Sequence, residues 1–144
     1  MAERYFEREE VERLIPQLTR IMERMMDAQR AVLEANQWLQ GEQRRIEMSG
    51  GGTVDQSAWR ITRERRDRGT RDVQKGLEQL QALGGVPKDL GLGLVDFLHL
   101  RDGREVNLCW RYGEERITHW HELDAGAAGR QPLTPEMVAG NGAA

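Results

Sequence analysis

Residue types that mark particular classes of protein are scarce in this sequence. The chain has one cysteine among its 144 residues, so it forms no internal disulfide and fits a reducing compartment. No run of about 18 apolar residues occurs, so we expect no membrane-spanning helix. The start of the chain also lacks an apolar signal segment, as is typical of cytoplasmic proteins. We therefore expect a cytoplasmic protein without a membrane partner.

Apolar residues are also limited in number. Aromatic residues make up 6% of the chain and hydrophobic residues 38%, whereas charged residues reach 31%. A chain of this length forms one ordinary domain, so we expect a single domain over residues 1–144 with a lean core. Helical proteins of this type often complete their core by self-association. The net charge of −3 argues against a dedicated nucleic-acid-binding protein.

The front of the chain predicts a long amphipathic helix. Its apolar residues alternate at spacings of three and four for four heptads, which indicates a helix packed lengthwise on others. Pro16 interrupts the early part and predicts a kink or a break near Ile15. The apolar stripe is wide enough to bury against more than one neighbour. The seam is Val11, Leu14, Leu18, Ile21, Met25, Ala28, Val32, Ala35 and Leu39, and the stripe is widened by Ile15, Met22, Met26 and Leu33.

A second helix follows and folds back on the first. Three consecutive glycines near residues 49–53 end the first helix and form the tip of a helical hairpin that spans residues 6–84. The second helix is expected from about Val54 to Leu83. Thr53 and Gln56 have the spacing of a capping box at its start.

Two glycines interrupt the apolar seam of the second helix. Gly69 and Gly76 each cost about 1 kcal/mol relative to alanine in a helix, so a packing reason is expected. Large side chains of the first helix would fill the space that each glycine leaves. Folding about the tip pairs Gly76 with Met25 or Met26, and Gly69 with Val32 or Leu33.

A basic segment lies in the middle of the second helix. It comprises Arg60, Arg63, Arg65, Arg66, Arg68, Arg71 and Lys75. Such a face could bind phosphate, RNA or the ribosome. Acidic residues are interleaved with it, however, and no aromatic platform accompanies it. We favour a solvated face that pairs with acidic positions of the first helix.

A three-stranded antiparallel β-meander is predicted over residues 92–122. Asp102-Gly103 between alternating apolar runs is typical of a type I′ hairpin turn, and Gly113-Glu114 of a type II′ turn. Residues 123–144 predict an irregular C-terminal loop and tail. The fold class is therefore α+β: a long antiparallel, coiled-coil-like helical hairpin followed by a three-stranded meander.

Turn length decides which side chains share a face of the meander. With two-residue turns, Phe97 lies opposite Leu108 and Leu108 lies opposite His119. If the second turn is one residue longer, Cys109 moves to the face that carries His119 and His121. The two registers therefore group different residues.

Each register offers a set of metal ligands. His99, His119 and His121 converge with two-residue turns, and Cys109, His119 and His121 converge with the longer second turn. Zinc or iron would suit either set, but neither has the spacing of a structural zinc motif. We favour histidines that cap the edge of the core through hydrogen bonds, and we predict no cofactor. Cys109 is more typical of a buried structural thiol than of a nucleophile.

Distinctive short stretches run along nearly the whole chain. They are Tyr5-Phe6, Glu9-Glu10, Leu14-Ile15-Pro16, residues 93–97, 101–106 and 108–111, Gly113-Glu114, Trp120-His121 and residues 126–133. In these stretches the chain resembles an uncharacterised prokaryotic family, DUF2203, from which it departs at Glu7, where a threonine helix cap would be more typical. The resemblance implies no activity.

The resemblance does imply a motif surface on the meander. Such a surface serves a binding site, or it fastens the meander to the C-terminal loop, for example through an ion pair of Arg130 with Asp96 or Glu114. Both interpretations stay open. The surface comprises Asp96, Cys109, Trp110, Glu114, His121 and Arg130.

The sequence favours a non-catalytic interaction or assembly module that self-associates through its helical hairpin. The wide apolar stripe predicts a homodimer with a four-helix arrangement. No catalytic constellation is evident, so an enzyme is not predicted. A metal-binding protein with a site on the meander is the first alternative. RNA or ribosome association through the basic face is the second.

Overall fold

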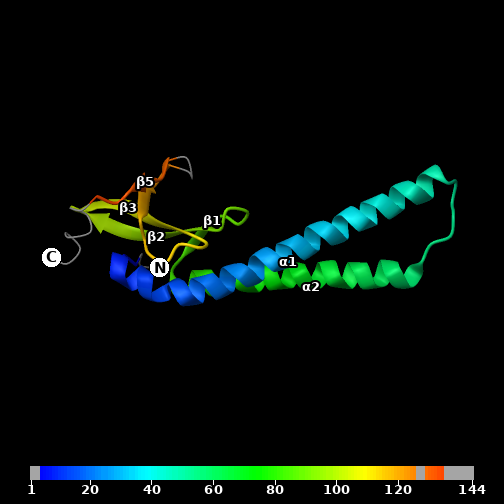
Figure 1. The fold of residues 1–144 in the computed structure, drawn as a ribbon, viewed down its shortest axis with the longest axis horizontal. Coiled ribbons are helices and arrows are strands. Elements are labelled where there is room, and N and C mark those ends of the chain that lie inside the picture. The colour runs from blue at the N-terminus through cyan, green and yellow to red at the C-terminus, as the bar shows by residue number, and fades with distance from the viewer. Residues whose placement is uncertain (1–3, 126–128, 135–144) are drawn as a thin grey trace. The chain divides into compact units, whose positions relative to one another are not determined.

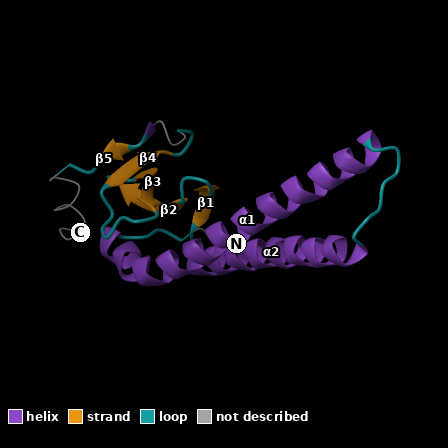
Figure 2. Cartoon of the chain, turned by 45° about the vertical axis from the view of Figure 1, so that its right-hand side comes forward, coloured by secondary structure: helices purple, strands orange, loops and turns teal. Residues whose placement is uncertain are grey.

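The fold class is α+β, as the sequence predicts. A computed structural model describes residues 4–125 and 129–134 of the chain. Neither of the two described helices contains an apolar stretch that could span a bilayer. Two helices precede an antiparallel sheet with strand order β1-β2-β3-β4-β5 (Figure 2). The elements are α1 (Arg8–Met48), α2 (Gln56–Leu83), β1 (Val86–Asp89), β2 (Leu94–Arg101), β3 (Arg104–Arg111), β4 (His119–Glu122) and β5 (Gln131–Pro132).

The chain divides into two compact units, and both helices run through the boundary. The sheet unit comprises Met1–Met22 and Leu77–Ala144, and the hairpin unit comprises Glu23–Gly76. The sheet unit therefore contains the whole sheet, the first turns of α1 and the last turns of α2. The hairpin unit contains the rest of the two helices and residues 49–55, which join them (Figure 1).

The sheet has five strands, so the prediction of a three-stranded meander was incomplete. β1 pairs with β2, and β5 pairs with β4, both antiparallel. β1 contains Pro87, which lacks a backbone donor and is tolerated because the strand lies at an edge. β5 lies in the segment expected to be irregular. Residues 126–128 and 135–144 lie outside the described residues.

The two turns of the meander differ from each other. Asp102 and Gly103 both have positive φ, at 52° and 79°, which confirms the type I′ turn. The tight turn at Gly113-Glu114 was a wrong prediction, because the connection between β3 and β4 spans residues 112–118. It begins with a turn in which the Glu114 N–H donates to the Arg111 carbonyl at 2.9 Å.

The start of α1 shows how acidic residues cap it. The helix begins at Arg8, and the backbone N–H of Glu7 donates to Glu10 Oε1 at 2.9 Å. This is one half of a capping box, built without the threonine. The bond from Glu7 lowers the pKa of Glu10. α1 is continuous through Pro16, so of the kink or break predicted near Ile15 the break does not occur.

The start of α2 lies slightly later than expected. The helix begins at Gln56, and Asp55 Oδ1 accepts a hydrogen bond from the Ala58 N–H at 3.0 Å. Asp55 is therefore the N-cap. The proposed capping box of Thr53 and Gln56 is wrong, because it was placed two residues too early.

The core of the sheet unit lies against one face of the sheet. Phe97 is fully buried, and its ring meets that of Phe6 edge-to-face at 5.1 Å. The backbone of Phe6 extends the pairing at the β2 edge, because its N–H donates to the Leu98 carbonyl at 2.7 Å. Its carbonyl accepts from His99 Nδ1 at 2.6 Å. His99 therefore serves the core, as the hydrogen-bonding interpretation of the histidines requires.

The hairpin unit packs through its glycines, as predicted. A Cβ atom on Gly69 would lie 2.8 Å from Val32 Cγ2, and one on Gly76 would overlap Met25. The two helix segments therefore approach closely where glycine faces a larger side chain. Nearer the tip, the rings of Trp38 and Trp59 meet at 6.0 Å.

Candidate functional site

The register of β4 determines which polar side chains gather on the second face of the sheet. Cys109 pairs with His119 on one side and with Asp96 on the other. Leu108 pairs with Trp120, so the two-residue register that placed His119 opposite Leu108 is wrong. The register expected for the longer second turn is the one observed. It puts Cys109, His119 and His121 on the face opposite to His99.

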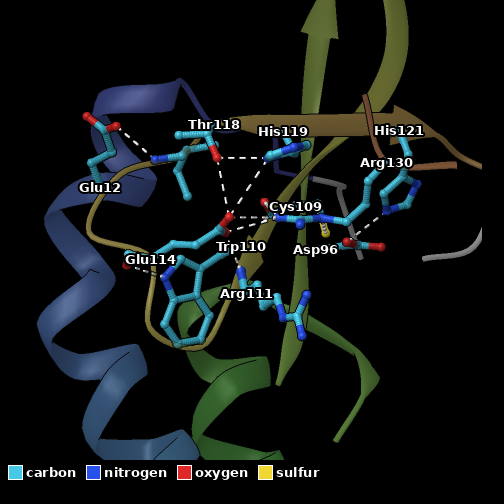
Figure 3. A network of polar contacts seen from close by, with 11 residues as sticks. Glu12, Asp96, Cys109, Trp110, Arg111, Glu114, Thr118, His119, His121 and Arg130 are labelled. Carbon is cyan, nitrogen blue, oxygen red and sulfur yellow. Dashed lines mark hydrogen bonds and ion pairs between the residues drawn. The ribbon is translucent and has the colours of Figure 1, made fainter. Parts of the chain in front are cut away.

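Three potential metal ligands meet on this second face. Asp96 from β2, Cys109 from β3 and His121 from β4 place a carboxylate oxygen, the thiol sulfur and a ring nitrogen within 4.8 Å of one another. Their exposed fractions are 1%, 1% and 2%. His121 Nε2 lies 2.9 Å from Asp96 Oδ1, as the dashed line between them in Figure 3 marks. We call these three residues the triad.

The triad overlaps only partly with the two metal sets that the sequence suggested. Cys109 and His121 belong to it, whereas His119 bonds to Thr118 and His99 lies on the other face. Asp96 was missed as a ligand, although its cross-strand pairing with Cys109 follows from the Asp102-Gly103 turn. The missing step was to count a carboxylate on β2 as a ligand beside the histidines.

Arg130 connects the triad to the segment before β5. Its Nε–H donates to Cys109 Sγ at 3.2 Å, and its Nη2 donates to Glu114 Oε1 at 3.0 Å. The predicted ion pair of Arg130 with Glu114 is therefore confirmed, and Asp96 pairs with His121 instead. A guanidinium that bridges a thiol and a carboxylate fixes the segment over the second face.

Glu114 organises the long connection between β3 and β4. Its carboxylate also accepts from the Arg111 N–H at 2.7 Å and from Thr118 Oγ1 at 3.3 Å, as Figure 3 shows. Its carbonyl accepts from Trp110 Nε1 at 3.0 Å. Glu12 of α1 accepts from the Ile117 N–H at 2.9 Å and holds the other end of the connection. These contacts, rather than a tight turn, determine the path of the chain.

The environment of Cys109 does not suit a nucleophile. Burial raises the pKa of its thiol to about 11, the Asp96 carboxylate adds to the shift, and Arg130 opposes it. The thiol is therefore protonated at neutral pH. Both nitrogens of His121 are engaged with oxygen atoms, at Asp96 and at the Glu122 carbonyl. A nucleophilic cysteine needs an accessible thiolate, and this arrangement raises the pKa of the thiol instead of lowering it.

The basic residues of α2 are partly neutralised by neighbours. Arg65 pairs with Glu34 of α1 at 3.0 Å, and Arg66 pairs with Asp67 at 3.1 Å. Arg60 and Arg63, together with Trp59, line an open pocket of about 490 Å³ near the tip. One aromatic side chain therefore accompanies the basic segment, contrary to the sequence-based expectation.

The comparisons with known proteins identify a family and nothing finer. The chain has no significant match among curated proteins or solved structures. A family model described as an uncharacterized conserved protein, DUF2203, matches residues 4–133. The match covers all five strands and both helices. The chain belongs to the DUF2203 family.

Proposed function

We propose that this protein is a non-catalytic, cytosolic interaction module that self-associates as a homodimer through its hairpin unit. One observation carries the proposal: the hairpin unit exposes more large apolar side chains than it buries. Its buried apolar side chains are Met25, Ala28, Ala35 and Leu39, and two of these are alanines. Its exposed large apolar side chains are Leu33, Trp38, Met48, Val54 and Ile61.

Three of the exposed residues lie within the helices and are more than half exposed, and one of them, Met48 at 83%, is the last residue of α1. Leu33 of α1 is 55% exposed and Ile61 of α2 is 59% exposed. Burying an aliphatic side chain of this size contributes about 1.5 to 3 kcal/mol. Two helices provide only one buried seam, whereas the apolar stripe of α1 is wider than a seam. A second copy, packed as a coiled-coil-like bundle of four helices, would cover the remainder.

The setting of Cys109 supports a reducing, cytosolic compartment. Its thiol is free and buried. A protein made for an oxidising compartment commonly uses its cysteines in disulfides. The same buried thiol, protonated at neutral pH, supports a non-catalytic role.

Sedimentation equilibrium of the full chain at micromolar concentration tests the proposal. We expect a dimer for the natural sequence and a monomer for the double variant Leu33→Glu/Ile61→Glu, because each carboxylate would be buried without a partner. Leu100→Glu is the matched control, since it makes the same change at a 42% exposed leucine of β2. This variant should remain dimeric.

Two results would contradict self-association through the hairpin unit. One is a natural sequence that stays monomeric across the concentration range. The other is a Leu100→Glu variant that dissociates to the same extent as the double variant. Far-ultraviolet circular dichroism of every variant confirms that the helices persist.

RNA or ribosome association remains the weaker alternative. The pocket beside Trp59, Arg60 and Arg63 favours it. The pairing of Arg65 and Arg66 with carboxylates opposes it, because a phosphate backbone would have to displace those partners. Binding of RNA that persists at moderate salt and is lost in Arg60→Gln/Arg63→Gln would bring this alternative to the front.

A further inference from the structure

The triad brings together three chemically different metal-binding groups from three neighbouring strands. A carboxylate, a thiol and an imidazole lie within 4.8 Å of one another, and all three side chains are buried. Donor atoms around a tetrahedral zinc ion lie about 3.3 to 3.6 Å apart, given bond lengths of about 2.0 to 2.3 Å. Small side-chain rotations would therefore bring the three atoms to coordination distance without moving a strand.

The two hydrogen bonds of His121 need one proton more than a neutral imidazole beside a carboxylate supplies. Its Nδ1 lies 2.7 Å from the Glu122 carbonyl oxygen, and its Nε2 lies 2.9 Å from Asp96 Oδ1. A neutral imidazole has one donor and one acceptor nitrogen, whereas a carbonyl and a carboxylate only accept. Hence either the imidazole carries both protons or the Asp96 carboxyl carries one. The buried pair holds one proton that a cation could replace.

The hydrogen bond at the second ring nitrogen of His121, Nδ1, is of the kind that a metal-bound histidine makes. With Nδ1–H donating to the Glu122 carbonyl, Nε2 is the ring nitrogen that faces Asp96, and it can bind an ion in the tautomer that leaves it unprotonated. Metal-ligating histidines commonly donate their second N–H to a backbone carbonyl or a carboxylate, which fixes the tautomer and the ring orientation. His121 therefore has this supporting contact in place.

A second, independent observation concerns the other oxygen of Asp96. Asp96 Oδ2 is buried, and no N–H or O–H donor from residues 4–125 or 129–134 reaches it. A buried carboxylate oxygen without a partner is destabilising. A bound cation would offset this, because it neutralises the carboxylate that the described part of the chain leaves half satisfied.

The charges around the triad also suit a divalent cation. A divalent ion balances one carboxylate and one thiolate, while Arg130 is balanced by Glu114 at 3.0 Å. The Nε–H of Arg130 donates to Cys109 Sγ at 3.2 Å and would stabilise a metal-bound thiolate. The bound site would therefore carry no net charge into the interior.

We propose that Asp96, Cys109 and His121 form a binding site for a divalent transition metal of borderline softness, such as zinc. The ligands are a carboxylate oxygen of Asp96, Sγ of Cys109 and Nε2 of His121. A sulfur and a nitrogen ligand disfavour calcium and magnesium, which prefer oxygen. On binding, the ion forms three coordinate bonds, and the Cys109 thiol proton and the proton of the His121–Asp96 pair leave to solvent. This site shares no residue with the surface proposed for self-association.

Cobalt titration of the full chain, after dialysis against a chelator, tests the proposal. Co²⁺ substitutes for zinc at such sites, and a thiolate ligand gives an intense charge-transfer absorption. We expect the band to saturate at about one ion per chain, and zinc alone to abolish it by displacement. Cys109→Ala should remove the band entirely, because alanine provides no sulfur ligand. His121→Asn should weaken Co²⁺ binding at least tenfold.

His119→Asn is the matched control for His121→Asn. The two histidines lie on the same strand and the same face, but His119 bonds to Thr118 and lies outside the triad. This variant should bind Co²⁺ within twofold of the natural sequence. If His121→Asn does not fold, Cys109→Ala still decides, since its change is small and removes only a thiol.

Several results would overturn the proposal. They are the absence of a charge-transfer band in the natural sequence, a band that persists in Cys109→Ala, and equal losses in His119→Asn and His121→Asn. The oligomeric state is recorded in the same samples. A natural chain that binds cobalt as a monomer, or dimerises without binding it, separates this proposal from self-association.

Discussion

The sheet unit and the hairpin unit are stabilised in different ways. In the sheet unit, large side chains such as Phe97, Trp110 and Leu108 are fully buried, and the second face holds buried polar groups. In the hairpin unit the contacts rely on glycines and alanines, and Leu33 and Ile61 stay exposed. A long heptad pattern therefore indicates packing without specifying the partner. We therefore expect most of the free energy of unfolding of a single chain to reside in the sheet unit.

Truncating a buried ring of the sheet unit and an exposed leucine of the hairpin unit tests this contrast most strongly. Phe97→Ala should lower the free energy of unfolding by about 3 to 5 kcal/mol, because it removes a buried ring and leaves a cavity. Leu33→Ala should change it by less than about 0.5 kcal/mol in the monomer, since its side chain is 55% exposed. Urea unfolding followed by circular dichroism measures both. Equal losses would show that the hairpin unit contributes as much as the sheet unit.

Unfolding at alkaline pH measures a contribution to the free energy of unfolding that comes from a buried thiol of the sheet unit. The folded pKa of Cys109 is raised from 9.0 to about 11, so the folded state retains its proton more tightly than the unfolded state. Metal-free protein should keep this stabilisation below pH 9 and lose on the order of 2 kcal/mol as the pH rises through about 11. Subtracting the same profile of Cys109→Ala isolates the effect of the thiol. A flat difference would show that the thiol is not buried.

Glycine substitutions sharpen the description of the hairpin unit. Gly69→Ala should destabilise the chain by about 1 to 3 kcal/mol, because the new Cβ would lie 2.9 Å from the Ala28 carbonyl oxygen. Gly41→Ala should stabilise it by up to about 1 kcal/mol, since a Cβ there meets no atom of the described chain within 4 Å. Thermal unfolding of the two variants measures both shifts. Opposite signs confirm close packing near Gly69, and two gains would contradict it.

The smallest expected effect concerns the helix start in the sheet unit. The pKa of Glu10 is lowered, mainly by the hydrogen bond from the Glu7 N–H. Its stabilising effect is thus present above its ordinary pKa of 4.5 and is lost as the pH falls through the lowered value. Glu10→Gln should remove this dependence, with a change of about 0.3 kcal/mol at neutral pH because the side chain is well solvated. Urea unfolding at several acidic pH values tests it against the natural sequence.

Local patterns predicted those features that depend on local chemistry. The heptad spacing predicted two long helices, Asp102-Gly103 predicted the β2–β3 hairpin, and the seam glycines predicted the contacts of Gly69 and Gly76. Each of these depends on residues that are close in sequence or on the antiparallel pairing of two helices about the hairpin tip. Such signals are strong because few alternative structures satisfy them.

The features that were missed depend on distant contacts. β1 and β5 are short and form only because the edges of β2 and β4 are available to them. The path of residues 112–118 is set by Trp110, Glu114 and Arg130, whose meeting no local pattern indicates. The partnership of Asp96 with His121 was missed because no carboxylate on β2 was counted as a partner of the histidines. A register must be known before a diagonal pair across three strands can be recognised.

The position of Arg130 has a consequence for biosynthesis. The ribosome delivers Cys109 well before Arg130, because the chain emerges from its N-terminus. Strands β2 and β3 can pair as soon as both have emerged, whereas the guanidinium that bonds to Cys109 Sγ arrives only after the following 21 residues. The bond to Cys109 Sγ therefore has to wait for the time needed to add this segment, about one to four seconds at about 5 to 20 residues per second. Until that bond forms, Cys109 Sγ lacks the guanidinium that holds it in the finished fold.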